Sequence, residues 1–310
     1  MISVVIPLYN KEQYISRSIQ SVLNQSVAVS EIIVVNDGST DNSLAVVKDA
    51  FLHETKVRII EQENKGVSAA RNTGIENASS EYIAFLDADD LWLPSFINNI
   101  HHLIDLVPNA VMFATQYGFY STAGRHPAVT RLLPDTPGKI NDYFASCVNA
   151  DLPVTASSVC IRKDTLNDIG CFPVGMIMGE DQVVWAKVAC QGEIMYHPEL
   201  SVYYDLGVEY SACSTHKVLE PAPQVSYYAE LIKSGSVPEH LITSLRRLMS
   251  LTIVSCAKNN LLDGNSQAAR QILLSHPNLI WDKYRIYGLI ATLIPRVFIA
   301  PLLKIVRNRK

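Results

Sequence analysis

Residues 82–90 read YIAFLDADD, a short apolar run that ends in three carboxylates within four positions. A continuous apolar run of this length is typical of a strand buried on both faces. Three acids at the end of such a strand repel one another, and their crowding is costly unless a cation balances the charge. Carboxylate oxygens suit Mg²⁺ or Mn²⁺, and phosphate oxygens can complete the coordination. The stretch therefore predicts a divalent-cation site at one end of a sheet; the alternative is a solvated turn in which Asp90 caps a helix.

Three similar runs precede this strand, at residues 3–7, 32–35 and 57–60. The segments between them carry apolar residues at helical spacing, most clearly in residues 15–23. Strands that alternate with helices form a mostly parallel sheet covered on both faces. The sequence therefore predicts a doubly wound α/β domain.

Polar groups follow each of these four strands. In open α/β sheets, ligands bind beyond the carboxyl ends of the strands. The groups expected at that edge are Tyr9-Asn10, Asn36-Asp37-Gly38-Ser39, Glu63-Asn64-Lys65-Gly66 and Asp87-Ala88-Asp89-Asp90. A sheet with a purely structural role would need no such concentration, so this edge is predicted to bind a ligand.

The chain changes character near residue 218. Before that point the expected elements are strands at about 111–120 and 157–161, irregular structure at 121–150 and a helix at 180–190. After Pro223, apolar residues recur at helical spacing to the end of the chain. We therefore expect an α/β domain over residues 1–218 and a helical C-terminal region over residues 219–310.

The composition excludes several classes of protein. With 26 basic against 30 acidic residues the formal net charge is −4, which offers no broad basic field for nucleic acid. Six cysteines occur without a C-x-x-C pair, so neither a zinc site nor a redox motif is indicated, and reduced, mostly buried thiols are expected. The first residues do not have the pattern of a signal peptide, and no uncharged apolar stretch reaches 18 residues. We expect a cytoplasmic protein.

Five segments occur in a fixed order: SVVIPLYN at 3–10, VVNDGSTD at 34–41, NKGVSAARNTGI at 64–75, AFLDADDLW at 84–92 and GED at 179–181. This series resembles the successive motifs of family 2 glycosyltransferases, over roughly residues 1–205. The resemblance implies the GT-A fold, an inverting mechanism and a nucleotide diphosphate sugar as donor, most often a UDP-sugar. It also implies a divalent cation, Mn²⁺ or Mg²⁺, and a glycan or lipid-linked acceptor in glycan or surface polysaccharide synthesis.

The resemblance also assigns roles to residues. Asp181 should be the general base, Asp89 should ligate the cation, and Asp87 should lie near the ribose and the cation. Asp37 should accept a hydrogen bond from the base, and Glu180 and Trp185 should contact the acceptor or support the site. The other residues expected at the nucleotide are Pro7, Tyr9, Asn10, Lys65 and Arg71.

Structural alternatives exist for four of these residues. Asp37 could be a turn residue before Gly38, and Tyr9 could belong to the core. Arg71 could form a surface ion pair on its helix, and Asp181 could be favoured at a helix N-terminus by the macrodipole alone.

The residue types fit the chemistry of such a transfer. The leaving group is a nucleoside diphosphate, whose charge a metal ion stabilises. An acceptor hydroxyl is a poor nucleophile until a base takes its proton. The sequence departs from the family pattern at three places: Lys187 stands where an arginine is common, Tyr204-Asp205 stands where an aromatic residue and an arginine are common, and only the loosely spaced His216 is a candidate for an additional metal ligand.

Two other functions remain open. A strand-end carboxylate such as Asp87 also marks aspartate-dependent phosphatases, although those enzymes place it after the first strand rather than the fourth. A sugar-nucleotide-binding protein without catalysis is the other alternative. The presence of Asp87, Asp89 and Asp181 together favours the enzyme.

The C-terminal tail is predicted to dock on an anionic membrane surface without spanning the membrane. Its apolar stripe consists of Ile286, Leu289, Ile290, Leu293, Ile294, Val297 and Phe298, and its basic residues are Arg285, Arg296, Lys304, Arg307, Arg309 and Lys310. Apolar burial together with basic residues suits an interfacial helix, while a charge in the middle of the stripe makes spanning costly. The alternative is that the stripe packs on the α/β domain.

Overall fold

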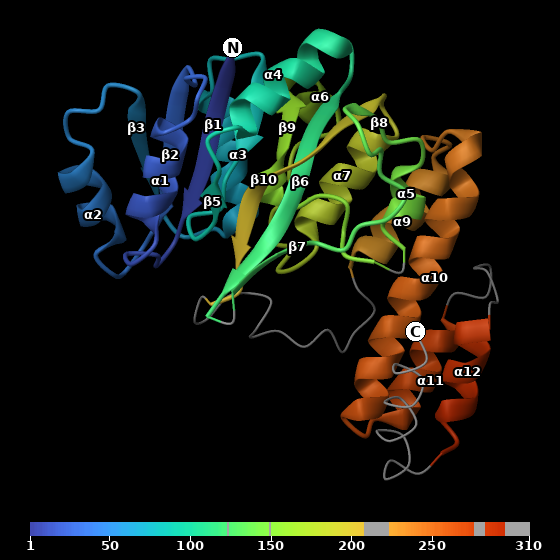
Figure 1. Ribbon diagram of the computed structural model, residues 1–310. Helices are drawn as coiled ribbons and strands as arrows, with labels where there is room; N and C mark the ends of the chain where they lie inside the picture. The colour runs from blue at the N-terminus through green and yellow to red at the C-terminus, as the bar shows by residue number, and fades with distance from the viewer. Residues whose placement is uncertain (123, 149, 208–222, 276–282, 295–310) are drawn as a thin grey trace. The chain divides into compact units, whose positions relative to one another are not determined.

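The computed structural model describes residues 1–122, 124–148, 150–207, 223–275 and 283–294 (Figure 1). The chain divides into two compact units, Met1–Val208 and Glu209–Lys310. The boundary predicted near residue 218 lies outside the described residues, and so does His216.

The first half of the sheet is parallel, as the alternation of strands and helices predicts. Its strand order is β3-β2-β1-β4, and each neighbouring pair is parallel. The strands are β1 (Ile2–Leu8), β2 (Glu31–Asp37), β3 (Val57–Gln62) and β4 (Tyr82–Phe85), and the helices between them are α1 (Ile15–Leu23), α2 (Ser43–Ala50) and α3 (Val67–Asn77). Every residue of β1 and β4 is buried, which explains why these strands are continuous apolar runs.

The second half of the sheet is mixed. β9 (Val159–Arg162) pairs antiparallel with both β4 and β6 (Met112–Ser121), and β10 (Ile194–Asp205) runs parallel to β6. Two antiparallel steps restore the direction of β4, so β6 and β10 end at the same edge of the sheet as β1 to β4. β5 (Leu91–Trp92) closes the order beside β10.

Residues 121–150 were predicted to be irregular, and this prediction is wrong in part. They contain β7 (Gly124–Pro127), β8 (Gly138–Lys139) and α5 (Tyr143–Ser146). β7 forms a hairpin with β6, but all four of its residues are exposed, so it has no apolar alternation for a sequence pattern to reveal.

The two faces of β1 carry different helices. Ile6 belongs to a core cluster that includes Ile19 of α1 and Ile97 of α4 (Phe96–Leu106). On the opposite face, Val5 meets α3 at Gly74, where an added Cβ would lie 2.3 Å from Val5 Cγ1. Glycine at this position allows the helix to approach the strand. Helices therefore cover both faces, as expected for a doubly wound sheet.

An aromatic cluster continues the second face. Phe85 of β4 is in register with Val5 and packs against Phe172 and Trp185, with ring centroids 5.3 and 6.4 Å away. Trp185 lies on α7 (Glu180–Ala189), which follows α6 (Lys163–Asp168). This cluster packs α7 against β4.

The described residues of the C-terminal unit contain α9 (Gln224–Lys233), α10 (Glu239–Leu262), α11 (Ser266–Leu274) and α12 (Lys283–Ala291). α10 carries a buried stripe that includes Leu241, Leu245, Met249 and Ile253, and it contacts the other three helices (Figure 1). Within the residues that the structure describes, no helix combines the length and apolar character needed to cross a membrane.

The structure corrects one part of the prediction for the tail. Arg285 does not add charge to the surface, because its side chain is fully buried and donates from Nε and Nη2 to the Leu273 carbonyl, at 2.8 and 2.6 Å. Ile286, Ile290 and Leu293 are 45%, 53% and 72% exposed. Residues 295–310, which carry most of the predicted basic charge, lie outside the described part of the chain.

Candidate active site

The loops after β1 and β2 are tied together at the carboxyl edge of the sheet. Asn10 has a φ of 51°, a conformation that asparagine tolerates better than most residues. The side-chain Oδ1 of Asn10 accepts from the backbone amide of Thr40 at 2.8 Å, and the backbone amide of Asn10 donates to Ser39 Oγ at 3.1 Å. Asn10 was predicted at the nucleotide, and its polar groups hold the two loops together. Tyr9 is 46% exposed, so the alternative that it belongs to the core is wrong, while Pro7 is buried in β1.

Asp37, the last residue of β2, organises the start of α3. Its Oδ1 accepts from Gln62 Nε2 at 2.7 Å and from the Lys65 amide at 2.9 Å, and its Oδ2 accepts from the Gly66 amide at 2.8 Å. A carboxylate offers about four acceptor positions, so one remains for a ligand. Lys65 takes part through its backbone, and its side chain is exposed.

The acids after β4 have three different environments. Asp87 Oδ1 accepts from Arg71 Nη2 at 2.7 Å, and Asp89 Oδ2 lies 2.6 Å from the ammonium nitrogen of Lys11. Asp90 is buried and accepts from Ser157 Oγ at 2.5 Å and from the Asp205 amide at 3.1 Å. Burial, followed by the charges of Asp89 and Asp87, raises the pKa of Asp90 well above its usual value.

Asp90 was weighed as a helix cap, and that alternative is wrong. The next helix, α4, begins only at Phe96. Asp90 instead ties the acidic loop to the segment before β9 and to the end of β10. Because the Asp87 amide also donates to Ser157 Oγ, at 3.1 Å, the same serine orders both ends of the acidic loop.

Arg17 and Ser18 of α1 hold the acidic loop from the other side, and sequence reasoning did not find either residue. Arg17 Nη2 donates to the Asp89 carbonyl at 2.6 Å and forms an ion pair with Asp205. Ser18 Oγ lies 2.9 and 2.7 Å from the carbonyl oxygens of Ala88 and Asp90. The family pattern commonly has an arginine where this chain has Asp205, and here the aspartate receives its positive charge from α1.

Arg71 links the acidic loop to α7. Its Nη1 donates to Glu180 Oε1 at 2.8 Å and its Nη2 to Asp87, while the ring of Phe172 lies 5.2 Å from the guanidinium carbon. The side chain is 4% exposed, so the alternative of a surface ion pair is wrong. Burial lowers the pKa of Arg71, but the charges of Asp87 and Glu180 raise it by more. The pKa therefore lies above its usual value, and Arg71 is charged at any physiological pH.

Asp181 lies beside Glu180 in the first turn of α7, which begins after Gly179 in the left-handed conformation. Its Oδ1 accepts from the Gln182 amide at 2.7 Å. Burial raises the pKa of Asp181 to about 6, the charge of Glu180 adds to the rise, and Arg71 opposes it. An elevated pKa of this size distinguishes Asp181 from an ordinary residue at a helix N-terminus, whose pKa the macrodipole would lower. Trp185 is 1% exposed, so its side chain belongs to the aromatic cluster beneath the site.

The residues present fit a divalent cation only in part. In the described residues, no group of three or more His, Cys, Asp or Glu side chains lies close enough to hold a metal ion. Asp87 and Asp89 supply carboxylates from one loop. Mg²⁺ and similar ions are commonly held by one or two carboxylates together with substrate phosphates. The site therefore fits a cation that arrives with a diphosphate.

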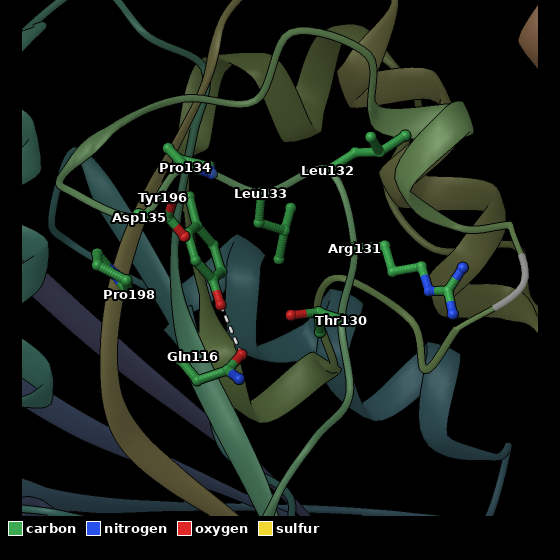
Figure 2. A pocket seen from close by; sticks show the side chains of 9 residues that line it. All are labelled: Gln116, Thr130, Arg131, Leu132, Leu133, Pro134, Asp135, Tyr196 and Pro198. Carbon is green, nitrogen blue, oxygen red and sulfur yellow. Dashed lines mark hydrogen bonds between the residues drawn. The ribbon is translucent and has the colours of Figure 1, made fainter.

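A cavity of about 280 Å³ lies apart from these acids (Figure 2). It is bounded by the loop at residues 130–135, by Gln116 of β6, and by Tyr196 and Pro198 of β10, and Tyr196 Oη donates to Gln116 Oε1 at 2.5 Å. None of the acids of the site lines it. Part of its wall comes from residues 130–135, within the segment that was predicted to be irregular.

Residues 3–157 match the sequence model of glycosyl transferase family 2. Glycosyltransferase GlyA of Streptococcus pneumoniae is 37% identical over 123 residues, which are 40% of this chain and 18% of GlyA. The minor teichoic acid biosynthesis protein GgaA of Bacillus subtilis is 40% identical over 107 residues, 33% of this chain and 24% of GgaA. The chain thus matches well under two thirds of the length of these relatives. The crystal structure of S. aureus TarS residues 1–349 with UDP-GlcNAc has a TM-score of 0.66 at 18% identity, covering 94% of this chain and 88% of that one, which is a likeness of fold.

Proposed function

The chain belongs to glycosyltransferase family 2, and we propose that it transfers a sugar from a UDP-sugar to a hydroxyl of a glycan acceptor with inversion at the anomeric carbon. One observation carries this proposal. The buried guanidinium of Arg71 joins Asp87, on the loop with Asp89, to Glu180, which is next to Asp181. A single side chain thus holds the acids suited to a metal–diphosphate and the acid suited to proton transfer in one site.

The donor side of the proposal rests on β1 and β2. The remaining acceptor position of Asp37 suits the N3–H of uracil, and the exposed ring of Tyr9, next to Pro7 and Asn10, is available to the base. Structural support comes from TarS, whose crystal structure with UDP-GlcNAc has a similar fold. Lys65 remains a candidate for the nucleotide because its side chain is exposed at this edge.

Asp89 would hold the divalent cation, with Asp87 beside it near the ribose. When bound, the cation would stabilise the negative charge that develops on the departing diphosphate. Arg71 orients Asp87, since its charged guanidinium is fixed between Asp87 and Glu180. Arg17 and Ser18 hold the backbone of the loop through its carbonyl oxygens.

Asp181 would accept the proton of the acceptor hydroxyl. With a pKa of about 6 it is mostly ionised at neutral pH, yet basic enough to take a proton during attack. The hydroxyl oxygen forms a bond to the anomeric carbon while the bond from that carbon to the diphosphate oxygen breaks. Attack from the face opposite the leaving group inverts the carbon, and no covalent enzyme intermediate is needed.

We also propose that the acceptor is lipid-linked and that the enzyme docks on an anionic membrane surface. The exposed apolar side chains of Ile290 and Leu293, which precede the basic residues of the tail in the sequence, support this proposal. Its test is cosedimentation of the double variant Ile290→Ser, Leu293→Ser with phosphatidylglycerol-containing vesicles at physiological salt. Weaker binding than wild type is expected, with Leu106→Ser, at an exposed leucine of α4, as the control. Equal sedimentation of all three proteins would contradict the docking.

The donor proposal is tested by the thermal midpoint with UDP, TDP and GDP, each with Mn²⁺ or with a chelator. A ligand that binds only the folded state raises the midpoint. UDP with Mn²⁺ is expected to raise it most, since guanine offers no matching N–H to Asp37. A rise with GDP and none with UDP or TDP would overturn the assignment of the base.

A further inference from the structure

Lys11 lies where a cation is expected in the proposed site. It follows Asn10 at the end of β1, and its ammonium nitrogen is 2.6 Å from Asp89 Oδ2. Both side chains are mostly shielded, at 19% and 17% exposure, so the attraction between them is only weakly screened by solvent. Burial raises the pKa of Asp89 above its usual value, the Lys11 charge opposes this rise, and the Asp87 charge adds to it. In this structure the ammonium is therefore the counter-ion of the proposed metal ligand.

The two arginines of the site are each held at two points. Arg71 bridges Asp87 and Glu180, and Arg17 bonds both the Asp205 carboxylate and a backbone carbonyl. Within the described part of the chain, the ion pair with Asp89 is the one salt bridge of Lys11, and the centroid of the Tyr14 ring lies 6.0 Å from its ammonium nitrogen. The contacts of Arg17 and Arg71 fix both side chains in place. The ammonium of Lys11, in contrast, can move away from Asp89 by rotation about the bonds of its own side chain.

The backbone of Lys11 stays in place during such a movement. Its amide donates to Ser43 Oγ at 2.7 Å, and its carbonyl accepts from the amides of Tyr14 and Ile15 at 2.9 and 3.0 Å. These bonds anchor the residue to α2 and to the start of α1. Only the four-carbon side chain is free to turn, and lysine serves readily as a mobile point charge for phosphate.

We propose that Lys11 competes with the divalent cation for Asp89 and thereby makes cation binding depend on the donor. This inference rests on the proposed function. A metal ion held by Asp89 would lie beside the carboxylate that the Lys11 ammonium now contacts. Two cations so close repel each other strongly in a shielded site. The diphosphate of the donor would remove this repulsion. Its oxygens would accept hydrogen bonds from the Lys11 ammonium, and the Asp89 carboxylate would then be available to the metal ion.

The consequence is a measurable coupling. The free enzyme binds Mn²⁺ weakly, and UDP increases the affinity for Mn²⁺ by a large factor. By linkage, Mn²⁺ increases the affinity for UDP by the same factor. Removal of the Lys11 charge should raise the affinity of the free enzyme for Mn²⁺ and reduce that factor.

The test measures Mn²⁺ binding by the electron paramagnetic resonance signal of free Mn²⁺, with and without UDP, and therefore does not depend on turnover. Lys11→Met is expected to bind Mn²⁺ without nucleotide about tenfold more tightly than wild type, and to show a coupling factor about tenfold smaller. Lys11→Arg keeps the charge and should bind free Mn²⁺ within about threefold of wild type. Lys48→Met, which removes an exposed lysine paired with Glu61, is the matched control and should equal wild type.

The outcomes separate the two proposals. If wild type binds Mn²⁺ with UDP and Lys11→Met has the wild-type affinity for Mn²⁺ alone, the role of Lys11 is refuted while the metal site stands. If neither wild type nor any variant binds Mn²⁺, with or without UDP, the proposed metal-dependent function is refuted, and the inference about Lys11 is refuted with it. Should Lys11→Met fail to fold by circular dichroism, Lys11→Gln, which keeps a hydrogen-bond donor for Asp89 without charge, is measured in its place.

Discussion

Substitution of Glu180 provides a direct test of whether Asp181 is the general base. Burial, Glu180 and Arg71 set the pKa of Asp181 at about 6, so the profile of kcat/KM against pH should have an acidic limb near that value. Activity is lost as pH falls through the limb, because protonated Asp181 cannot accept a proton from the acceptor. Glu180→Gln removes the negative charge beside Asp181 and keeps the shape of the side chain and an oxygen for Arg71.

The sign and size of the effect follow from the site. The rise of the Asp181 pKa from 3.8 to about 6 has burial as its first cause and Glu180 as its second. Loss of the Glu180 charge therefore lowers the pKa, and Arg71, with one carboxylate fewer to balance it, acts in the same direction. Because burial persists, we expect the acidic limb to move down by about 0.5–1 pH unit, worth about 1 kcal/mol.

The assay is the initial rate of nucleotide release at low donor concentration and fixed ionic strength, so that kcat/KM reports the free enzyme. Glu193→Gln, at an exposed acid paired with Lys139, controls for the loss of one negative charge. A limb that stays at the wild-type position in Glu180→Gln, or that moves to higher pH, would refute the reasoning. Equal shifts in both variants would mean that net charge, rather than the contact with Asp181, moves the limb.

Three further predictions concern the metal, the base and the fold. Asp89→Ala should abolish the effect of Mn²⁺ on UDP affinity, as measured by calorimetry; wild-type coupling in this variant would place the cation elsewhere. Asp181→Asn should keep donor affinity and lose about 10²–10⁴-fold in turnover, and a rate within twofold of wild type would show that another group is the base. Gly74→Ala should lower the free energy of unfolding by about 1–3 kcal/mol, because its Cβ would overlap Val5; an unchanged denaturant midpoint would contradict the close packing of α3 on β1.

The sequence was sufficient to predict the parallel half of the sheet. β1 and β4 are buried along their whole length, so their apolar runs are unbroken, and the polar residues after them are easy to recognise. β5, β7 and β8 could not be predicted in this way, because they have two to four residues and depend on the strands beside them. The register of β10 is interrupted between His197 and Val202, which obscures any alternation there.

The site could be predicted where one short segment carries the chemistry, and not where distant segments combine. Asp87 and Asp89 stand out because they follow a buried strand, and Arg71 does bond Asp87. The partners Lys11 with Asp89 and Arg17 with Asp205 are 78 and 188 residues apart in the chain, and no local pattern joins them. Asp90 resembled a cap because a helix follows it, but its partners Ser157 and Asp205 are known only from the tertiary structure.

The most direct test of the central claim is the metal-dependent cleavage of UDP-sugars without acceptor, with product analysis. Water then takes the place of the acceptor hydroxyl, and the account predicts slow release of UDP and free sugar in Mn²⁺. The release should be blocked by chelator and reduced at least about 10²-fold in Asp181→Asn. Release of UMP and a sugar phosphate would indicate a different bond and a different enzyme. Cleavage that is equally fast in chelator and in Asp181→Asn would contradict the proposed function outright.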